Sequence, residues 1–129
     1  MPVVRTAALQ FAQLAGRLSA DPLPSGLDTG CSLRVVRVTP GPRTPHVHPH
    51  SAELAYVAEG SGTAWEGDVP TRVAAGDLFV VPAGVPHATV ADPSDLVLIC
   101  FFPHADLSAN IIELAGPVLG GGDKQSGGL

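Results

Sequence analysis

The chain has few basic residues and no long apolar segment. Seven Lys and Arg stand against 12 Asp and Glu, for a formal charge of -5, and the basic residues form no cluster. Neither nucleic acid nor an anionic membrane is therefore an expected partner. The first 16 residues, MPVVRTAALQFAQLAG, lack the basic start, the continuous apolar region and the cleavage site of a secretion signal, and no stretch is long enough to span a bilayer. We therefore expect a cytoplasmic protein.

Cysteine is scarce as well. Cys31 and Cys100 are single residues within apolar runs. Free cysteine is usually buried, and two residues do not make a disulfide framework. The pattern predicts buried free thiols in a reducing compartment, with a bridge between the two as the alternative.

Several common catalytic signatures are absent. No Gly-rich phosphate loop leads from a strand into a helix, no Ser/His/Asp set stands out, and no repeat of solenoid length is visible. The 129 residues, 45% hydrophobic and 15% charged, predict one folded domain with its own core.

Glycine and proline, in contrast, are abundant. The 15 glycines and 13 prolines mostly separate short apolar runs, which is typical of many strands joined by tight turns. We expect an all-β double-sheet jelly roll over residues 1–119. A Pro-rich loop is expected at 19–26, a short helix or strand at 111–115 and a flexible Gly-rich tail at 120–129. The expected strands lie near residues 8–13, 32–39, 46–48, 52–58, 62–66, 71–74, 78–81, 87–90 and 96–102.

Three histidines and one carboxylate have the spacing of a metal site. His46 and His48 are two residues apart, so on a strand they point to the same side. Glu53 follows five residues later, in an apolar run where an unpaired carboxylate would cost several kcal/mol. His87 arrives from a separate segment, after the turn PAGVPH. Imidazole and carboxylate together suit one divalent ion, zinc, iron, manganese or nickel, with coordination positions left for water or substrate.

These segments resemble the two motifs of the cupin family. Residues 41–60 contain a glycine, HxH, a glutamate and a second glycine, and residues 76–91 contain the pattern G-x5-P-x-G-x2-H. The spacer before His46 is one residue short of the common form, and Ala91 stands where the family usually has asparagine. The resemblance implies a single-domain cupin, a double-stranded β-helix or jelly-roll barrel, with a metal bound between the two motifs.

His50 is ambiguous. It continues the two-residue period of His46 and His48, but Pro49 favours a bend there. A surface position is one reading; a fourth imidazole ligand in place of Glu53, or an acid/base at the rim, are the others. Glu53 itself could instead orient an imidazole. His104 lies outside both motifs, and its position alone gives little reason to place it at the site.

Strand alternation predicts the cavity lining. If Glu53 and His87 face inward, so do Ala55, Val57 and Thr89, which are small or apolar. Arg34 and Arg37 fall on opposite faces of one strand, and solvated positions are favoured for both. No polar clamp for a sugar or phosphate is evident. An apolar pocket of this kind suits an aromatic or polyketone-like small molecule.

The chain is also similar to small single-domain cupins among the bacterial aromatic-polyketide cyclases, through its size and its HPH sequence. This resemblance implies a metal-dependent cyclase of antibiotic or secondary-metabolite biosynthesis. The metal would act as a Lewis acid, and a metal-bound hydroxide or His50 would be the base. An iron-dependent dioxygenase that cleaves a diketone or phenol is one alternative, and a non-catalytic ligand-binding cupin is another. Apolar sheet faces favour a homodimer.

Overall fold

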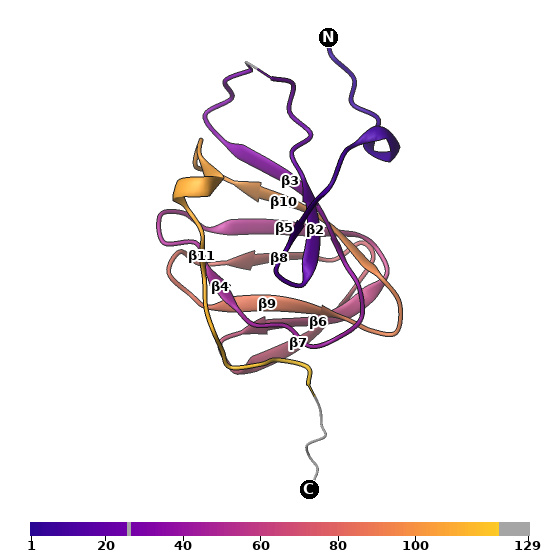
Figure 1. Ribbon diagram of the computed structural model, residues 1–129, viewed down its shortest axis with the longest axis vertical. Coiled ribbons are helices and arrows are strands. Elements are labelled where there is room, and N and C mark those ends of the chain that lie inside the picture. The colour runs from indigo at the N-terminus through magenta and orange to yellow at the C-terminus, as the bar shows by residue number, and fades with distance from the viewer. Residues whose placement is uncertain (26, 122–129) are drawn as a thin grey trace, which may run out of the picture.

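Two antiparallel sheets, stacked as layers, form the protein (Figure 1). The computed structural model describes residues 1–25 and 27–121. Within these residues the only helical turns are two short 3-10 segments, η1 (Thr6–Ala8) and η2 (Leu107–Ala109), and no helix is long and apolar enough to cross a membrane. The predicted all-β double-sheet jelly roll is therefore confirmed.

The first sheet has six strands in the order β1-β2-β3-β10-β5-β8. The central strand β10 pairs with β3 on one side and with β5 on the other, so segments far apart in sequence lie side by side. Its strands are β1 (Ala12–Leu14), β2 (Arg17–Ala20), β3 (Ser32–Val38), β10 (Leu96–Phe102), β5 (Glu53–Glu59) and β8 (Leu78–Val81).

The second sheet has five strands in the order β11-β4-β9-β6-β7. Its edge strand β11 comes from the C-terminal segment, which runs over the side of the barrel in Figure 1 and pairs with β4. Its strands are β11 (Ile112–Glu113), β4 (His46–Val47), β9 (His87–Ala91), β6 (Ser61–Glu66) and β7 (Val69–Ala74).

The core lies between the two sheets. Period-2 alternation turns every second side chain of β3, β5 and β10 inward, where they lose contact with water. Each buried aliphatic side chain contributes about 1.5–3 kcal/mol from its removal from solvent. The main cluster consists of Val36, Val38, Ala55, Val57, Val73, Ala91, Leu96, Leu98, Cys100 and Phe102.

One motif glycine is required by packing. Gly60, between β5 and β6, has a φ of 81°, and a Cβ at this position would collide with the carbonyl oxygen of Asp95. Only glycine combines the positive φ with so close a backbone approach. The glycine that closes the first motif therefore lets the chain turn from one sheet into the other.

The predictions for the N-terminal part of the chain need correction. The strand expected at residues 8–13 begins only at Ala12, because Thr6–Ala8 forms η1. The loop expected at 19–26 is wrong at its start, since Ser19 and Ala20 belong to β2. The strand β2 was not predicted. A two-residue turn that contains Gly16 (φ 71°) folds it directly back onto β1.

The C-terminal segment resolves one open alternative. Of the two structures expected for residues 111–115, the strand is present, as β11. Most of the expected tail at 120–129 lies outside the described residues. The boundary of the domain at residue 119 stays a prediction.

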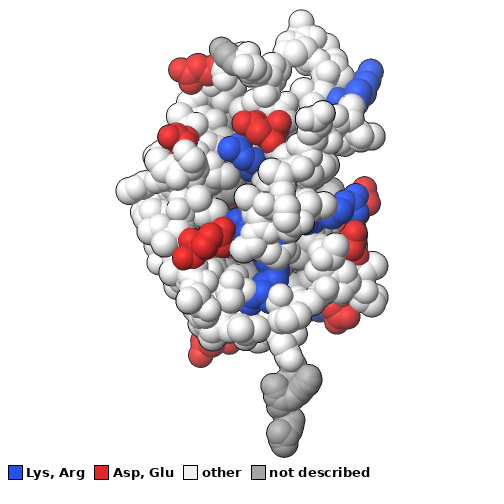
Figure 2. Space-filling model, viewed as in Figure 1, with Lys and Arg blue, Asp and Glu red and all other residues white. Residues whose placement is uncertain are grey.

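The surface carries mixed charge and one apolar area. On the face shown in Figure 2, Asp and Glu are interspersed with Lys and Arg, without an extended basic area. Tyr56, Leu78, Val80 and Phe101 are 46%, 65%, 56% and 36% exposed on the neighbouring strands β5, β8 and β10. The expected homodimer stays a prediction, and this outer sheet face is where we expect it to form.

Candidate metal centre

Four buried side chains converge between the sheets. His46 lies in β4, His48 follows that strand, and Glu53 and His87 are the first residues of β5 and β9. The register pairs His46 directly with His87, and the turns before Glu53 and His87 bring the other strands to the same end of the barrel. One potential ligand atom from each side chain lies within 4.8 Å of all the others. This is the group that the HxH spacing and the two motifs predict.

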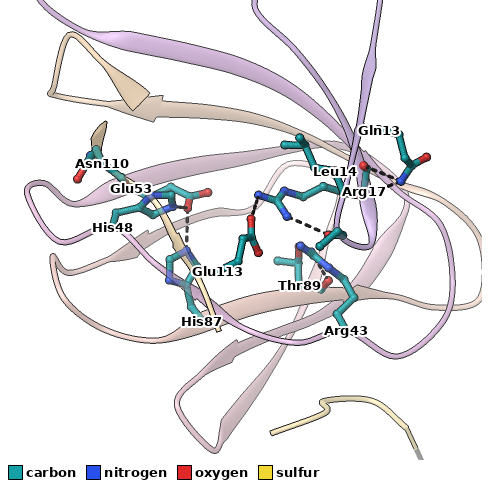
Figure 3. A network of polar contacts seen from close by, with 11 residues as sticks. Gln13, Leu14, Arg17, Arg43, His48, Glu53, His87, Thr89, Asn110 and Glu113 are labelled. Carbon is teal, nitrogen blue, oxygen red and sulfur yellow. Dashed lines mark hydrogen bonds and ion pairs between the residues drawn. The ribbon is translucent and has the colours of Figure 1, made fainter. Parts of the chain in front are cut away.

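The carboxylate of Glu53 is at the centre of this group. Its Oε1 atom lies 2.9 Å from Nε2 of His48 and 2.9 Å from Nε2 of His87 (Figure 3). The rings of His46 and His87 meet edge to face, with 4.4 Å between their centroids. Three imidazoles and one carboxylate therefore share a very small volume.

Backbone carbonyls orient two of the imidazoles. Nδ1 of His48 lies 2.8 Å from the carbonyl oxygen of Asn110, and Nδ1 of His87 lies 2.9 Å from that of Val85. A carbonyl only accepts hydrogen bonds, so each Nδ1 carries the proton and donates. In the neutral ring, Nε2 then presents its lone pair towards Glu53. Two lone pairs that face a carboxylate oxygen are unfavourable without a cation near them, and a metal ion would be such a cation.

The electrostatics also favour a metal. Burial, followed by repulsion from His87 and Arg17, lowers the pKa of His46 from 6.5 to about 2, so this imidazole is neutral. Burial alone would raise the pKa of Glu53, but the close contacts of its carboxylate with the His48 and His87 imidazoles outweigh burial and lower that pKa below its ordinary value. Neutral imidazole and ionised carboxylate are the forms that bind metal ions.

The donor set therefore fits one divalent ion. His46 also has a buried Nδ1 atom with no hydrogen-bond partner, so its ring is not already committed to protein groups on that side. His46, His48, Glu53 and His87 could together hold the ion, and a six-coordinate metal would keep two positions for other molecules. Zinc, iron, manganese and nickel all accept these donors.

His50 does not join the donor group. Its side chain is exposed and stacks on His104, with 5.7 Å between ring centroids. Its backbone N–H donates to Oδ1 of Asn110 over 2.8 Å, which holds the bend after Pro49. The structure thus places both histidines outside the four-residue group, and an acid/base role for His50 stays a prediction.

A cavity of about 630 Å³ adjoins the donors. Thr89 lines it, whereas Ala55 and Val57 face inward but are fully buried in the core. The apolar part of the wall includes Val36, Leu98 and Phe102. The prediction of an inward face with small and apolar side chains is correct for these strands.

The expectation that the cavity lacks a polar clamp is wrong. Arg34 lines the cavity instead of being solvated, because its position on β3 faces the interior, and it pairs with Asp21 at 3.4 Å. Arg17 and Arg43 line it too and are both buried. Arg37, on the opposite face of β3, pairs with Asp95 at the surface, as predicted.

Sequence reasoning missed four residues around the cavity. Arg17 comes from the unpredicted strand β2, and its Nη2 atom donates to Glu113 of β11 over 2.9 Å. Asn110 supplies the carbonyl for His48 from a segment outside both motifs. Arg43 lies inside the first motif. Its charge, between glycine and proline residues, was the one feature of the sequence that could have singled it out. Arg17, Asn110 and Glu113 belong to no local sequence pattern, because only long-range pairing brings them near the cavity.

Both cysteines are free thiols. Cys100 is buried in the core, and burial raises the pKa of its thiol. Cys31 is only partly buried. The alternative of a bridge between them is therefore wrong, while burial of both is correct only for Cys100.

Fold and site together define a small β-barrel with an interior group of side chains that could hold a metal ion. Residues 34–102 match the family described as the cupin domain, and they contain both motifs. The chain belongs to the cupin family.

Individual relatives agree with this assignment. Germin-like protein 9-1 of Oryza sativa subsp. japonica is 31% identical over 85 residues, which are 60% of this chain and 34% of the rice protein, so the chain spans about a third of that relative. A predicted oxalate decarboxylase from Thermotoga maritima is 18% identical with a TM-score of 0.70, over 78% of this chain and 97% of that one.

The polyketide cyclase RemF from Streptomyces resistomycificus is 22% identical with a TM-score of 0.69, over 92% of this chain and 83% of that one. At these identities the solved structures show a shared fold.

Proposed function

We propose that this protein is a metal-dependent cyclase that promotes aldol-type ring closure of a poly-β-ketone in the biosynthesis of an antibiotic or another secondary metabolite. The observation that carries the proposal is the position of the four metal donors against a cavity of about 630 Å³. A metal buried in a packed core would be structural, whereas open coordination positions beside a cavity can meet an organic molecule. The shared fold of the polyketide cyclase RemF supports this choice of reaction.

The chain and the metal have separate tasks in this reaction. A divalent ion, for which we propose zinc, would supply Lewis-acid chemistry for a bound ketone. His46, His48, Glu53 and His87 would hold that ion, with the Asn110 and Val85 carbonyls fixing two of the rings.

The apolar wall contributes through shape. Val36, Leu98 and Phe102 exclude water from the cavity and can hold a flexible polyketone in one folded conformation. Such positioning of two reacting groups supplies a large share of the rate in ring closures. His50 stays the base predicted from the sequence, although its exposed side chain stacks on His104 and does not line the cavity.

Oxygen dependence tests the reaction. Ring closure by enolate attack loses only water, whereas a dioxygenase consumes oxygen together with its substrate. A linear poly-β-ketone or a simpler 1,3-diketone would be incubated with zinc-loaded and with ferrous protein, each with and without oxygen, with the H87A variant as the control. We expect the zinc form to be active without oxygen and H87A to be inactive.

Two results would replace the proposal. Strict dependence on both iron and oxygen would establish the dioxygenase, which the same donor set allows. No turnover under any condition, combined with tight binding of an apolar ligand, would identify a binding protein instead.

A further inference from the structure

Arg43 is a buried cation with unused hydrogen-bond donors. It lies between β3 and β4, is 5% exposed and lines the same cavity as the metal donors. Its Nη1 atom donates to the carbonyl oxygen of Thr89 over 2.8 Å and to Oγ1 of Thr89 over 3.2 Å. Its Nε and Nη2 atoms are buried without any hydrogen-bond partner. Leaving donors of a charged group unpaired in the interior is costly, so a ligand that accepts from them would be stabilised.

Neighbouring arginines differ from Arg43 in having acidic partners. Arg17 pairs with Glu113 at 2.9 Å and Arg34 with Asp21 at 3.4 Å. Among the described residues no carboxylate lies within ion-pair distance of Arg43. Burial and then repulsion from Arg17 lower the pKa of Arg43 from 12.5 to about 10, which leaves it charged at neutral pH. Arg43 therefore carries a positive charge that no carboxylate neutralises at ion-pair distance, although the more distant Glu113 and Glu53 attract it.

The N-terminal hairpin covers the side chain of Arg43. Gly16, in the turn between β1 and β2, lies so close that a Cβ there would be 3.0 Å from Nε, 3.2 Å from Cγ and 3.4 Å from Cδ of Arg43, so only a glycine at this position leaves room beside Nε. In Figure 3 the Arg17–Glu113 pair lies between the histidine and glutamate group and the Arg43–Thr89 pair. The packed stem fixes the guanidinium in place, which lowers the entropic cost of binding a ligand there.

We infer that Arg43 binds a carboxylate of the substrate, so that the molecule presented to the metal centre is an organic acid with an apolar body. A planar guanidinium with two free N–H groups matches the two oxygens of a carboxylate. A single guanidinium without an ion-pair partner favours a monoanion over a phosphate dianion, and the apolar wall favours a hydrocarbon or aromatic body. The inference rests on the proposed function, because it names the substrate class of the same cavity.

Binding of 2-naphthoate, compared with its neutral analogue 2-naphthamide, tests the inference by calorimetry without turnover. Both would be titrated into chelator-treated and zinc-loaded protein. We expect naphthoate to bind roughly tenfold to a hundredfold more tightly than the amide in both forms, and R43M to abolish this preference. R37M is the matched control, because Arg37 is paired with Asp95 on the outer face, and it should keep the preference.

Several outcomes would overturn the inference. These are equal affinities for acid and amide, no naphthoate binding to folded wild-type protein, a preference retained in R43M, or naphthoate binding that needs zinc. If R43M does not fold, as judged by circular dichroism, R43K replaces it. Lysine cannot hold both Thr89 and a carboxylate in one planar fork, so an undiminished preference in R43K would also overturn the inference.

The same titrations distinguish failure of the proposed function from failure of this inference. If zinc does not bind but chelator-treated protein still prefers naphthoate, the metal-dependent reaction is refuted while the acid site stands.

Discussion

The carbonyl oxygen of Asn110 lies 2.8 Å from Nδ1 of His48, a contact across 62 positions of the sequence. The Asn110 side chain is fully buried and strengthens this link, since Nδ2 donates to Oγ of Ser51 and Oδ1 accepts from the His50 backbone. One residue of the C-terminal segment thus fixes both the His48 ring and the loop that leads to Glu53.

Replacing Asn110 by Ala should therefore weaken metal binding without removing a ligand. Alanine keeps the backbone carbonyl that accepts from His48 and loses only the side-chain bonds to Ser51 and to the His50 backbone, so we expect at most about a tenfold loss of zinc affinity, with a loss of about 1–3 kcal/mol in unfolding free energy. Competition with a chromogenic chelator measures the first, and urea unfolding the second. S108A, an exposed change in the same segment, is the control, and unchanged zinc affinity in N110A would contradict the positioning role.

The three histidines should each be needed for metal binding. H46A, H48A and H87A are expected to lose most of their bound metal while remaining folded, because the main core cluster contains none of them. Elemental analysis of protein purified without an affinity tag measures occupancy, and H104A serves as the control outside the group. Full occupancy in two of the three variants would refute the ligand assignment.

The E53Q variant distinguishes a Glu53 that binds the metal directly from a Glu53 that only orients a histidine. The amide keeps the shape of the side chain but loses the charge, so a ligand role predicts a loss of metal affinity as large as in the histidine variants. An orienting role predicts the milder loss of about tenfold to a hundredfold. E59Q, at the exposed end of the same strand, should bind metal like the wild type.

Acid should destabilise the metal-free protein. The pKa of His46 is about 2 in the folded state and 6.5 ordinarily, so between these values the unfolded chain binds the extra proton and stability falls as pH falls. The slope from His46 alone approaches about 1.4 kcal/mol per pH unit. The lowered pKa of Glu53 acts in the same direction below its ordinary value of 4.5.

Urea unfolding of chelator-treated protein between pH 7.5 and 4.5 measures this slope, and H46Q should flatten it. Zinc-loaded protein should lose its metal over the same range, because protons compete for the imidazoles. Equal stabilisation by zinc at neutral and at acid pH would rule out imidazole ligation.

The sequence was sufficient for features that depend on local spacing. Alternation in β3, β5 and β10, the HxH pair and the turn before His87 all act within a few residues, and they correctly predicted the sheets and the convergence of the four side chains. The polar half of the cavity depends on long-range pairing instead. Nothing in the sequence near Arg17 or Glu113 indicates that these two residues, 96 positions apart, form an ion pair. For this reason the sequence predicted a cavity without polar side chains that could hold a ligand.

The cavity is built from parts with separate origins in the chain. All four metal donors lie within the segment 34–102 that defines the family, whereas Arg17, Asn110 and Glu113 lie outside it. Mutation of the N-terminal hairpin or the C-terminal strand could therefore change which molecules enter while the metal donors stay the same. Grafting these two flanks onto another member of the family would change the cover of the cavity but would not transfer Arg43, which lies within the family segment.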